Sequence, residues 1–307
     1  MTRTAATTRS SARSLTQRWV AEHLPPRPEQ SHKGDFGRLI IVAGSVEYPG
    51  AAMLTALGAM RAGVGVVRVA VAESVAARLA GIVPELTWMV LDEEAPGLIA
   101  PSGWRRVTTE AAAYDAVVIG PGLGGQPATL RRARNLVAAI RVPAVIDADG
   151  LNALADGGSW WTGLRAPLVL TPHPGEFGRL VRGEAPPADD EVARSRAALD
   201  AAIRWRQVVV LKGANSVVAS PDGELLHSEV SSPALATAGT GDVLAGVIGA
   251  FLAGGLTPFV AAACGVAVHG AAGLIAEDRI GRAGVMARDV ATLLPEAIEQ
   301  LRGGRGQ

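Results

Sequence analysis

An aspartate stands where a glycine-rich turn runs into a long apolar segment. The turn is TAGTGD, residues 237–242, and VLAGVIGAFLAG follows directly. Free backbone N–H groups point outward at such a helix start, so Gly239 and Gly241 predict a pocket that suits a phosphate. With the amides holding a migrating phosphoryl group, Asp242 is placed to take the proton of the attacking hydroxyl. The alternative is that Asp242 only caps the helix and complements its dipole.

Lysine is rare in this chain, and nearly all of its basic residues are arginine. Lys33 and Lys212 are the only lysines of the chain, and each precedes a glycine. An ammonium is a compact point charge, which arginine does not reproduce at a phosphate. Lys212 follows the apolar run VVVL, so a strand end and a binding role are favoured over a surface position. Lys33, in HKGDFG, is as readily explained by pairing with acids.

Other polar residues also follow apolar runs. His173 lies between two prolines in LTPHPGEF, and Glu176 comes three residues later. A rigid polar group suits a ligand contact, although a lone histidine is more often structural. Glu176 suits either the orientation of a substrate or of Mg²⁺ through water, or the first turn of the following helix. Asp147, Asp149 and Asn152, in DADGLN, suit a place near a metal, or Asp149 caps the next helix, and no metal ligand is identified.

These residues need a scaffold that brings them together. Strand-like runs alternate with helical runs, and five strands end in turns rich in Gly, Asp or Pro: AGSVEYPG, GPGLGG, DADG, TPHPGE and KGANS. The alternation predicts an α/β fold with a mainly parallel central sheet and helices on both faces. Ligands bind such sheets beyond the carboxyl ends of the strands, so we expect the five turns and TAGTGD to share one edge.

We expect one domain over residues 15–302, without repeats. Periodicity predicts strands over 38–44, 64–73, 85–91, 114–122, 143–150, 166–177 and 208–213. It predicts helices over 50–63, 74–83, 126–140 and 191–206, a hairpin in NSVVASPDGELL, and mostly helix after residue 240. The Arg-, Ser- and Thr-rich residues 1–14 are expected to be a disordered tail rather than a transit peptide, and residues 303–307 a C-terminal tail.

Composition excludes several classes of protein. The 307 residues carry 29 basic and 29 acidic side chains, a balance that argues against nucleic acid or an anionic membrane as the main partner. Gly, Pro or charge interrupts the apolar stretches before the ~18 residues of a membrane span, so none is expected. Cys264, the single cysteine, lies in the apolar run AAACGVAVHG, where we expect core filling. Without disulfides, the chain suits a reducing cytoplasm.

The motifs together resemble a known family. GTGD leading into an apolar helix resembles the anion-hole motif of the ribokinase-like superfamily. The ordered set KGDFGRLIIVAGSVEYPGAA, GPGLG, DADGLNAL, LTPHPGEFGRL, LKGANSVVA and TAGTGDVLAGVIGAFLAGG resembles ADP/ATP-dependent NAD(P)H-hydrate dehydratase from about residue 15 to residue 302. This resemblance implies a ribokinase-like fold and a stand-alone dehydratase domain, without room for the epimerase domain fused to it in many bacteria.

The resemblance also implies a reaction. The family phosphorylates the ring hydroxyl of the (S)-epimer of NADHX or NADPHX from ADP or ATP, and phosphate then leaves to restore NADH or NADPH. Because bacterial relatives mostly use ADP, we expect ADP as co-substrate, with Mg²⁺, and AMP and phosphate as products. A separate NAD(P)HX epimerase as partner, a cytoplasmic location and a homotetramer are further expectations.

Roles carry over to matching positions. Ala43, Gly122 and His173 match positions that contact the hydrated dinucleotide, and Asp242 matches the contact at the reacting hydroxyl. The loop that holds AMP is matched by Lys212, Gly213, Ala214, Asn215 and Ser216, with Gly241 as a further AMP contact. Ser216 stands where the family more often has Thr, but it keeps the hydroxyl. Gly150 stands where Ala is commoner, which loosens a helix start.

Three other functions are weighed against this one. A kinase for a vitamin precursor such as hydroxyethylthiazole would share GTGD, but it would not need both PHPGE and AGSVEYPG. A non-catalytic nucleotide-binding regulator would be favoured by the loss of Asp242 or Lys212, and both are present. A Rossmann dehydrogenase is disfavoured because GPGLGG does not have the G-x-G-x-x-G spacing.

Overall fold

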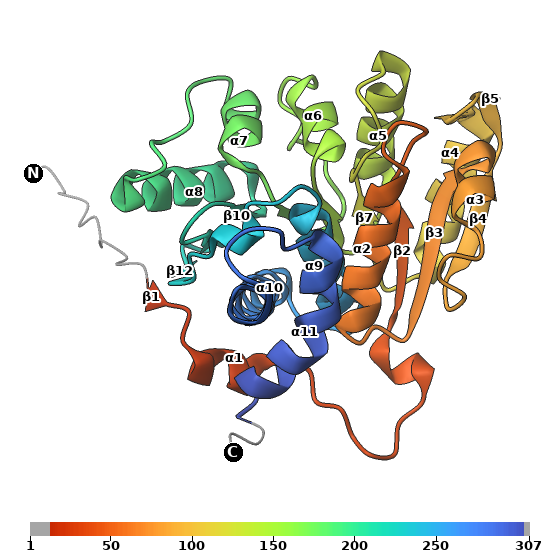
Figure 1. Cartoon of the computed structure of the whole chain (residues 1–307). Helices are drawn as coiled ribbons and strands as arrows, with labels where there is room; N and C mark the ends of the chain where they lie inside the picture. Colours follow the sequence, from red (N-terminus) through yellow and green to blue (C-terminus); the bar gives the residue numbers. More distant parts are fainter. Residues whose placement is uncertain (1–12, 304–307) are drawn as a thin grey trace, which may run out of the picture.

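The computed structural model describes residues 13–303 (Figure 1). Most of the predicted tails, residues 1–12 and 304–307, lie outside the described residues. The N-terminal boundary of the domain needs a correction, because strand β1 (Arg13–Ser14) pairs in parallel with β12 (Leu225–His227). The backbone hydrogen bonds of this pairing bring two residues of the predicted tail into the sheet.

One sheet holds ten strands of the described chain, in the order β1-β12-β11-β10-β9-β8-β7-β2-β3-β4. Pairing is parallel from β10 to β4, and β10–β11 and β11–β12 are antiparallel. The prediction of a mainly parallel sheet with a hairpin is therefore confirmed. The remaining strands of this sheet are β2 (Arg38–Val42), β3 (Val66–Ala72), β4 (Thr87–Leu91), β7 (Ala116–Ile119), β8 (Ala144–Ile146), β9 (Leu168–Leu170), β10 (Val208–Leu211) and β11 (Val217–Ala219).

The central strands read as continuous apolar runs because helices cover both of their faces. All four residues of β7 and of β10 are buried. A small second sheet, β5 (Glu93–Ala95) with β6 (Leu98–Ile99), was not expected from the sequence. Its register is irregular, and neither strand carries the apolar alternation by which a strand is recognised.

Helices cover both faces of the sheet (Figure 1). On one face α2, α9, α10 and α11 pack against one another, while α8 packs on β10 to β12 and α5, α6 and α7 contact each other in turn. The helix α4 was not predicted. The helices are α1 (Gln17–His23), α2 (Pro49–Arg61), α3 (Glu73–Leu79), α4 (Pro101–Glu110), α5 (Pro127–Ala139), α6 (Asp149–Ala155), α7 (Pro174–Val181), α8 (Glu191–Trp205), α9 (Thr240–Ala253), α10 (Pro258–Ile280) and α11 (Ala287–Leu301).

Helices α2 and α9 touch backbone to backbone. A Cβ atom at Gly246 would lie 2.0 Å from the carbonyl oxygen of Thr55. A Cβ atom at Gly58 would lie 2.4 Å from the carbonyl oxygen of Val243. Only glycine permits this approach, and it fixes how far the first turn of α9 projects over the sheet.

Helix α10 corrects one expectation. By length and composition alone, α10 could cross a membrane. The sequence pattern predicts instead that Gly, Pro or charge interrupts every apolar stretch before it reaches the length of a membrane span. Glycines do not end this helix; they admit neighbours, as at Gly265, where a Cβ atom would lie 2.5 Å from Ile248. In the protein 78% of its apolar window is buried, which identifies a core helix. Cys264 lies on it fully buried, in agreement with core filling.

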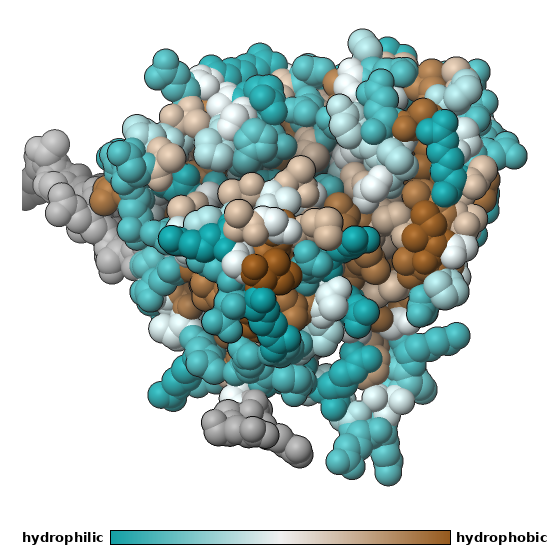
Figure 2. All heavy atoms as spheres, viewed as in Figure 1, coloured by the Kyte–Doolittle hydropathy of each residue, from teal (hydrophilic) through white to brown (hydrophobic). Residues whose placement is uncertain are grey.

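Polar side chains cover most of the face seen in Figure 2, and apolar side chains form separate patches near its middle and on its right side. Most apolar residues instead form one buried cluster that joins both faces of the sheet. The sheet is therefore a rigid platform for the turns at its edge.

Candidate active site

The five predicted turns do share one edge of the sheet. They follow β2, β7, β8, β9 and β10, which are neighbours in the order β10-β9-β8-β7-β2 and run parallel. The first turn of α9 joins them, since a Cβ atom at Gly241 would lie 3.4 Å from the Nζ atom of Lys212. The sheet thus gathers residues from six separate parts of the chain.

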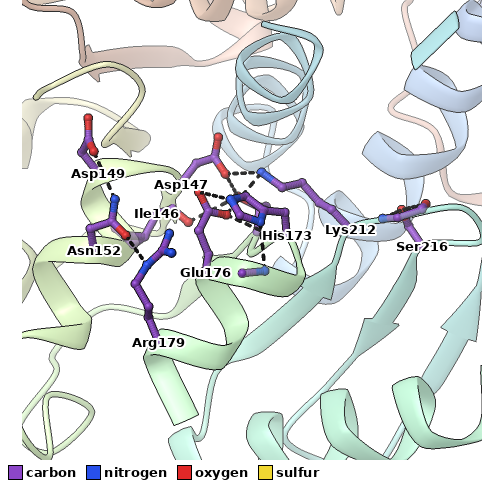
Figure 3. Close-up of polar contacts among 12 residues, drawn as sticks. Ile146, Asp147, Asp149, Asn152, His173, Glu176, Arg179, Lys212 and Ser216 are labelled. Atoms are coloured by element: carbon purple, nitrogen blue, oxygen red, sulfur yellow. Dashed lines mark hydrogen bonds and ion pairs between the residues drawn. The ribbon is translucent and has the colours of Figure 1, made fainter. Parts of the chain in front are cut away.

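Lys212 and Asp147 form the centre of this edge (Figure 3). The Lys212 Nζ atom donates to Asp147 Oδ1 at 2.8 Å, and the Thr171 hydroxyl donates to the same oxygen at 2.7 Å. The side chains of Lys212 and Asp147 are 18% and 2% exposed. Burial alone lowers the pKa of Lys212, but the carboxylates of Asp147 and Glu176 outweigh it and raise that pKa. A full positive charge is therefore held at the strand ends.

Glu176 occupies the first turn of α7, one of the two positions expected for it. Its Oε2 atom accepts the backbone N–H of His173 at 2.8 Å, which caps α7. The same oxygen lies 3.8 Å from Lys212 Nζ (Figure 3). Burial raises the pKa of Glu176 to about 7, with Lys212 opposing the shift and Asp147 adding to it. A carboxyl group that is half-charged near neutral pH lies beside the ammonium.

His173 is the N-terminal cap of α7. Its Nδ1 atom accepts from the backbone N–H of Gly175 at 3.0 Å, and its Nε2 atom lies 3.4 Å from Glu176 Oε1. Burial, and then the positive charge of Lys212, lower the pKa of His173. The neutral ring with its proton on Nε2 satisfies both contacts. The side chain is 50% exposed, so it remains open to a ligand.

Asp242 lies in the first turn of α9, but it does not cap that helix. The cap is Gly239, at φ 88°, and no side chain accepts a capping hydrogen bond there. Burial raises the pKa of Asp242 to about 7; Asp147 adds to the shift and Lys212 opposes it. Such a group accepts a proton efficiently at neutral pH. The structure therefore excludes the capping hydrogen bond, while Asp242 keeps a place in the first turn that also complements the helix dipole.

Asp149 and Asn152 belong to a separate network. Asp149 accepts the backbone N–H of Gly124 at 2.8 Å and the Asn152 amide at 3.1 Å. Asn152 in turn accepts from the Arg179 guanidinium at 2.9 Å (Figure 3). These bonds tie the turn after β7 to α6 and α7, and the charge of Asp149 also helps to raise the pKa of Asp242.

Ala148, the residue between Asp147 and Asp149, has a strained backbone conformation. Its φ of 49° and ψ of −118° are unfavourable for any residue with a side chain. This conformation lets Asp147 face Lys212 while Asp149 faces Gly124. Nothing in the residue type signals such strain, and the sequence therefore did not reveal it.

The predicted nucleotide loop, Lys212–Ser216, borders a cavity of about 580 Å³. The Ser216 hydroxyl donates to the carbonyl of Gly213 at 3.0 Å. Beneath the loop, the buried Arg194 donates to the carbonyl of Leu211 at 3.3 Å. The cavity has the size of a small-ligand site. Among the predicted residues it is lined by His173, Lys212, Gly213, Ala214, Ser216 and Gly241, and Asn215 is in the same loop.

Ala43 and Gly122 lie in the neighbouring turns. The side chain of Ala43 is fully buried, so a ligand there would meet its backbone. Gly44 donates to the carbonyl of Pro121 at 2.7 Å, which joins the two turns. A Cβ atom at Gly122 would lie 2.8 Å from that of Tyr48, so glycine is required for this close packing. The turns that contain Ala43 and Gly122 therefore lie along the same edge of the sheet as the cavity, but outside its wall.

The acids fit a cation that arrives with phosphates. Within residues 13–303 no group of three or more His, Cys, Asp or Glu side chains could hold a metal ion. Mg²⁺ commonly binds through substrate phosphates, waters and one or two carboxylates. Asp147 and Glu176, the carboxylates beside Lys212, could supply those contacts.

A second cavity, of about 260 Å³, lies among the C-terminal ends of α2, α9 and α11. Arg27, Phe36 and Arg302 are in its wall, and the Arg27 guanidinium stacks 3.8 Å from the Phe36 ring centre. None of the predicted site residues lines it. The predicted site residues instead gather at the cavity beside the nucleotide loop.

The sequence of this chain is similar to one family of known proteins and to several of its members. The model of the NAD(P)H-hydrate dehydratase family matches residues 39–296. The ADP-dependent (S)-NAD(P)H-hydrate dehydratase of Xanthomonas campestris is 39% identical over 280 residues, 89% of this chain and 91% of that protein. A bifunctional NAD(P)H-hydrate repair enzyme of Moorella thermoacetica is 40% identical over 296 residues, 96% of this chain and 56% of that protein. The chain spans about half the length of such bifunctional relatives.

Solved structures agree with the sequence comparison. The crystal structure of an ADP/ATP-dependent NAD(P)H-hydrate dehydratase from Bacillus subtilis, co-crystallised with ATP and Mg²⁺, superposes with a TM-score of 0.82. That chain is 31% identical to this one, and the match covers 95% of this chain and 99% of that chain. The ribokinase-like fold expected from the motifs is thereby confirmed over a single domain.

Proposed function

We propose a reaction from one premise: the chain belongs to the NAD(P)H-hydrate dehydratase family. The proposed reaction is the ADP-dependent dehydration of the (S)-epimer of NADHX or NADPHX to NADH or NADPH, with AMP and phosphate as products. The observation that carries it is the pairing of an ammonium with a proton acceptor, Lys212 beside the helix start that bears Asp242. A phosphoryl acceptor and donor can meet between these groups.

In the first step Asp242 takes the proton of the ring hydroxyl. The hydroxyl oxygen then bonds to the terminal phosphorus of ADP, and the bond from that phosphorus to the bridging oxygen breaks to release AMP. Free N–H groups in the first turn of α9, beside Gly239 and Gly241, hold the transferred group, while Lys212 balances its charge. Asp242 faces the acceptor rather than the phosphate, and this explains an acid beside an anion pocket.

The second step is an elimination. The ring carbon–oxygen bond breaks, and phosphate leaves with the bonding electrons. The neighbouring ring carbon gives a proton to water, and the electrons of its C–H bond restore the double bond that hydration removed. Ala43, Gly122 and His173 are proposed to hold the hydrated ring and its dinucleotide, because they extend along the edge from the cavity.

The donor is proposed to be ADP, bound by Lys212–Ser216 and Gly241. Support comes from the cavity beside this loop and from the name of the Xanthomonas relative. Mg²⁺, carried by the nucleotide phosphates, would neutralise their charge, with Asp147 or Glu176 contacting its water. A separate NAD(P)HX epimerase as partner, a homotetrameric assembly and a cytoplasmic location complete the proposal; the last rests on the single buried Cys264.

Chemically hydrated NADH tests the proposal directly. The purified protein and Mg²⁺ are mixed with it, ADP or ATP is added in separate cuvettes, and the absorbance band of NADH is followed. A rise with ADP alone supports the proposal, and a rise with ATP alone changes only the donor. No rise with either nucleotide, when ADP binding is shown by calorimetry, would overturn the dehydratase assignment.

A further inference from the structure

The wall of the cavity beside the nucleotide loop contains a buried histidine that the proposed reaction does not use. His269, on α10, forms part of the wall that also contains Lys212 and Gly241. Only 8% of His269 is exposed, and its Nε2 atom is buried without a hydrogen-bond partner in the described part of the chain. Buried polar atoms are nearly always paired, so an unpaired one in a ligand cavity needs an explanation.

Apart from the exposed Ser231, the hydroxyl groups of this wall are occupied. The hydroxyls of the wall residues donate within the protein: Ser216 to Gly213, Ser232 to Glu277, Thr237 to Ala234, and Thr240 to Leu235 and Thr237. Apolar side chains of Leu235 and Leu244 fill much of the remainder. His269 is therefore the buried hydrogen-bonding side chain that the fold leaves available to a ligand.

The charge of His269 decides which part of a ligand it suits. Burial lowers its pKa to about 4, with the Thr240 backbone opposing and Lys212 adding to the shift. The ring is therefore neutral at pH 7; one of its nitrogens hydrogen-bonds the Thr240 backbone, and Nε2 is the nitrogen left for a ligand. A neutral imidazole interacts only weakly with a phosphate, and Lys212 already lies where it can bind one. The imidazole can instead hydrogen-bond the hydroxyl or amine groups of a nucleoside.

We infer that His269 recognises the nucleoside part of the phosphoryl donor, through a hydrogen bond between its imidazole and a sugar hydroxyl or base amine. This inference rests on the proposed use of ADP at the same cavity. It assigns separate tasks to two residues: Lys212 holds the phosphates, and His269 selects the group attached to them. The residue affects which donor is accepted rather than how fast a bound donor reacts.

Calorimetry with two probes separates these tasks. ADP carries phosphates and a nucleoside, whereas inorganic pyrophosphate carries the phosphates alone. In His269→Leu we expect ADP affinity to fall by about tenfold and pyrophosphate affinity to stay as in wild type. His269→Asn, which keeps a donor and an acceptor, should retain more ADP affinity than His269→Leu. Cys264→Ala, buried on the same helix outside the cavity wall, serves as control for disturbance of α10.

An NMR measurement on the wild-type protein covers the case in which the His269 variants do not fold. With ¹⁵N-labelled histidine, the ring nitrogens of His269 should shift when ADP is added and stay in place when pyrophosphate is added. Unmoved nitrogens with bound ADP, or a parallel loss of both ligands in folded His269→Leu, would overturn the inference alone. A wild-type protein that binds no ADP would instead overturn the proposed function as well.

Discussion

The Nζ atom of Lys212 lies 2.8 Å from Oδ1 of Asp147, although 65 positions of sequence separate the two residues. They directly follow strands β10 and β8, which both pair with β9. Because parallel strands present their carboxyl ends at one edge, the pair forms wherever the sheet forms. The ammonium then lies beside the start of α9, where it opposes the rise in the pKa of Asp242.

Asp242→Asn should abolish turnover. The amide keeps the size of the side chain but accepts no proton, so we expect kcat to fall by about 10²–10⁴-fold. NADH formation from the hydrated dinucleotide measures this loss, and calorimetry should find ADP affinity close to that of wild type. Residual activity above about one tenth of wild type would exceed what loss of a general base permits.

The same substitution should stabilise the fold at alkaline pH. The pKa of Asp242 is about 7 in the folded protein and lower in the unfolded chain, so folding takes up a proton between these values. Its contribution to stability is complete at low pH and is lost as the pH rises through about 7.

We therefore expect Asp242→Asn to raise the free energy of unfolding at pH 8 by about 1–2 kcal/mol, since it removes a buried charge near Asp147. Urea denaturation at pH 8 and pH 4.5 measures the difference, which should shrink at the lower pH. An equal effect at both pH values would argue against the raised pKa.

Lys212→Met should weaken ADP binding by about 10–100-fold, because the phosphates lose their point charge. Met keeps the length of the side chain, and calorimetry measures the change. The chain offers a matched control in its other lysine: Lys33 is exposed in a short 3-10 helix, and Lys33→Met should bind ADP as wild type does. Equal affinity in both variants would remove Lys212 from the site.

Ala148→Gly should stabilise the protein by about 1 kcal/mol. Glycine adopts the observed φ of 49° without a steric penalty, and this relief of strain outweighs its greater freedom in the unfolded chain. Thermal and urea denaturation measure the gain. As control, Ala197→Gly in the middle of α8 should destabilise by about 1 kcal/mol. A loss at both positions would show that Ala148 carries no strain.

Gly246→Ala should destabilise the fold by about 1–3 kcal/mol and lower kcat. The added methyl group would lie 2.0 Å from the carbonyl oxygen of Thr55, so α9 must move away from α2 and carry Asp242 with it. Gly50→Ala in the first turn of α2, where a Cβ atom meets nothing within 4 Å, should leave stability unchanged or slightly higher. Similar denaturation midpoints for the two variants would contradict the close packing.

Much of the fold was predictable because its signals are local. The buried runs of β2, β7 and β10 are apolar throughout, and the hairpin of β11 and β12 is marked by its turn residues. Helix α4 and the sheet of β5 and β6 lack such signals. Helix α10 misled the sequence interpretation because its glycines serve close packing, and glycine alone does not reveal whether a helix ends or is approached.

Residue types and spacing by themselves determined the parallel sheet, the turns at its edge, and the candidates Asp242, Lys212 and His173. Tertiary structure alone decided that Asp147 is the partner of Lys212, while Asp149, two positions later, serves a different turn. It alone showed the strain at Ala148 and the unpaired nitrogen of His269. The physical reason is that pKa values, strain and hydrogen-bond satisfaction depend on neighbours from distant parts of the chain, which meet only when the strands pair.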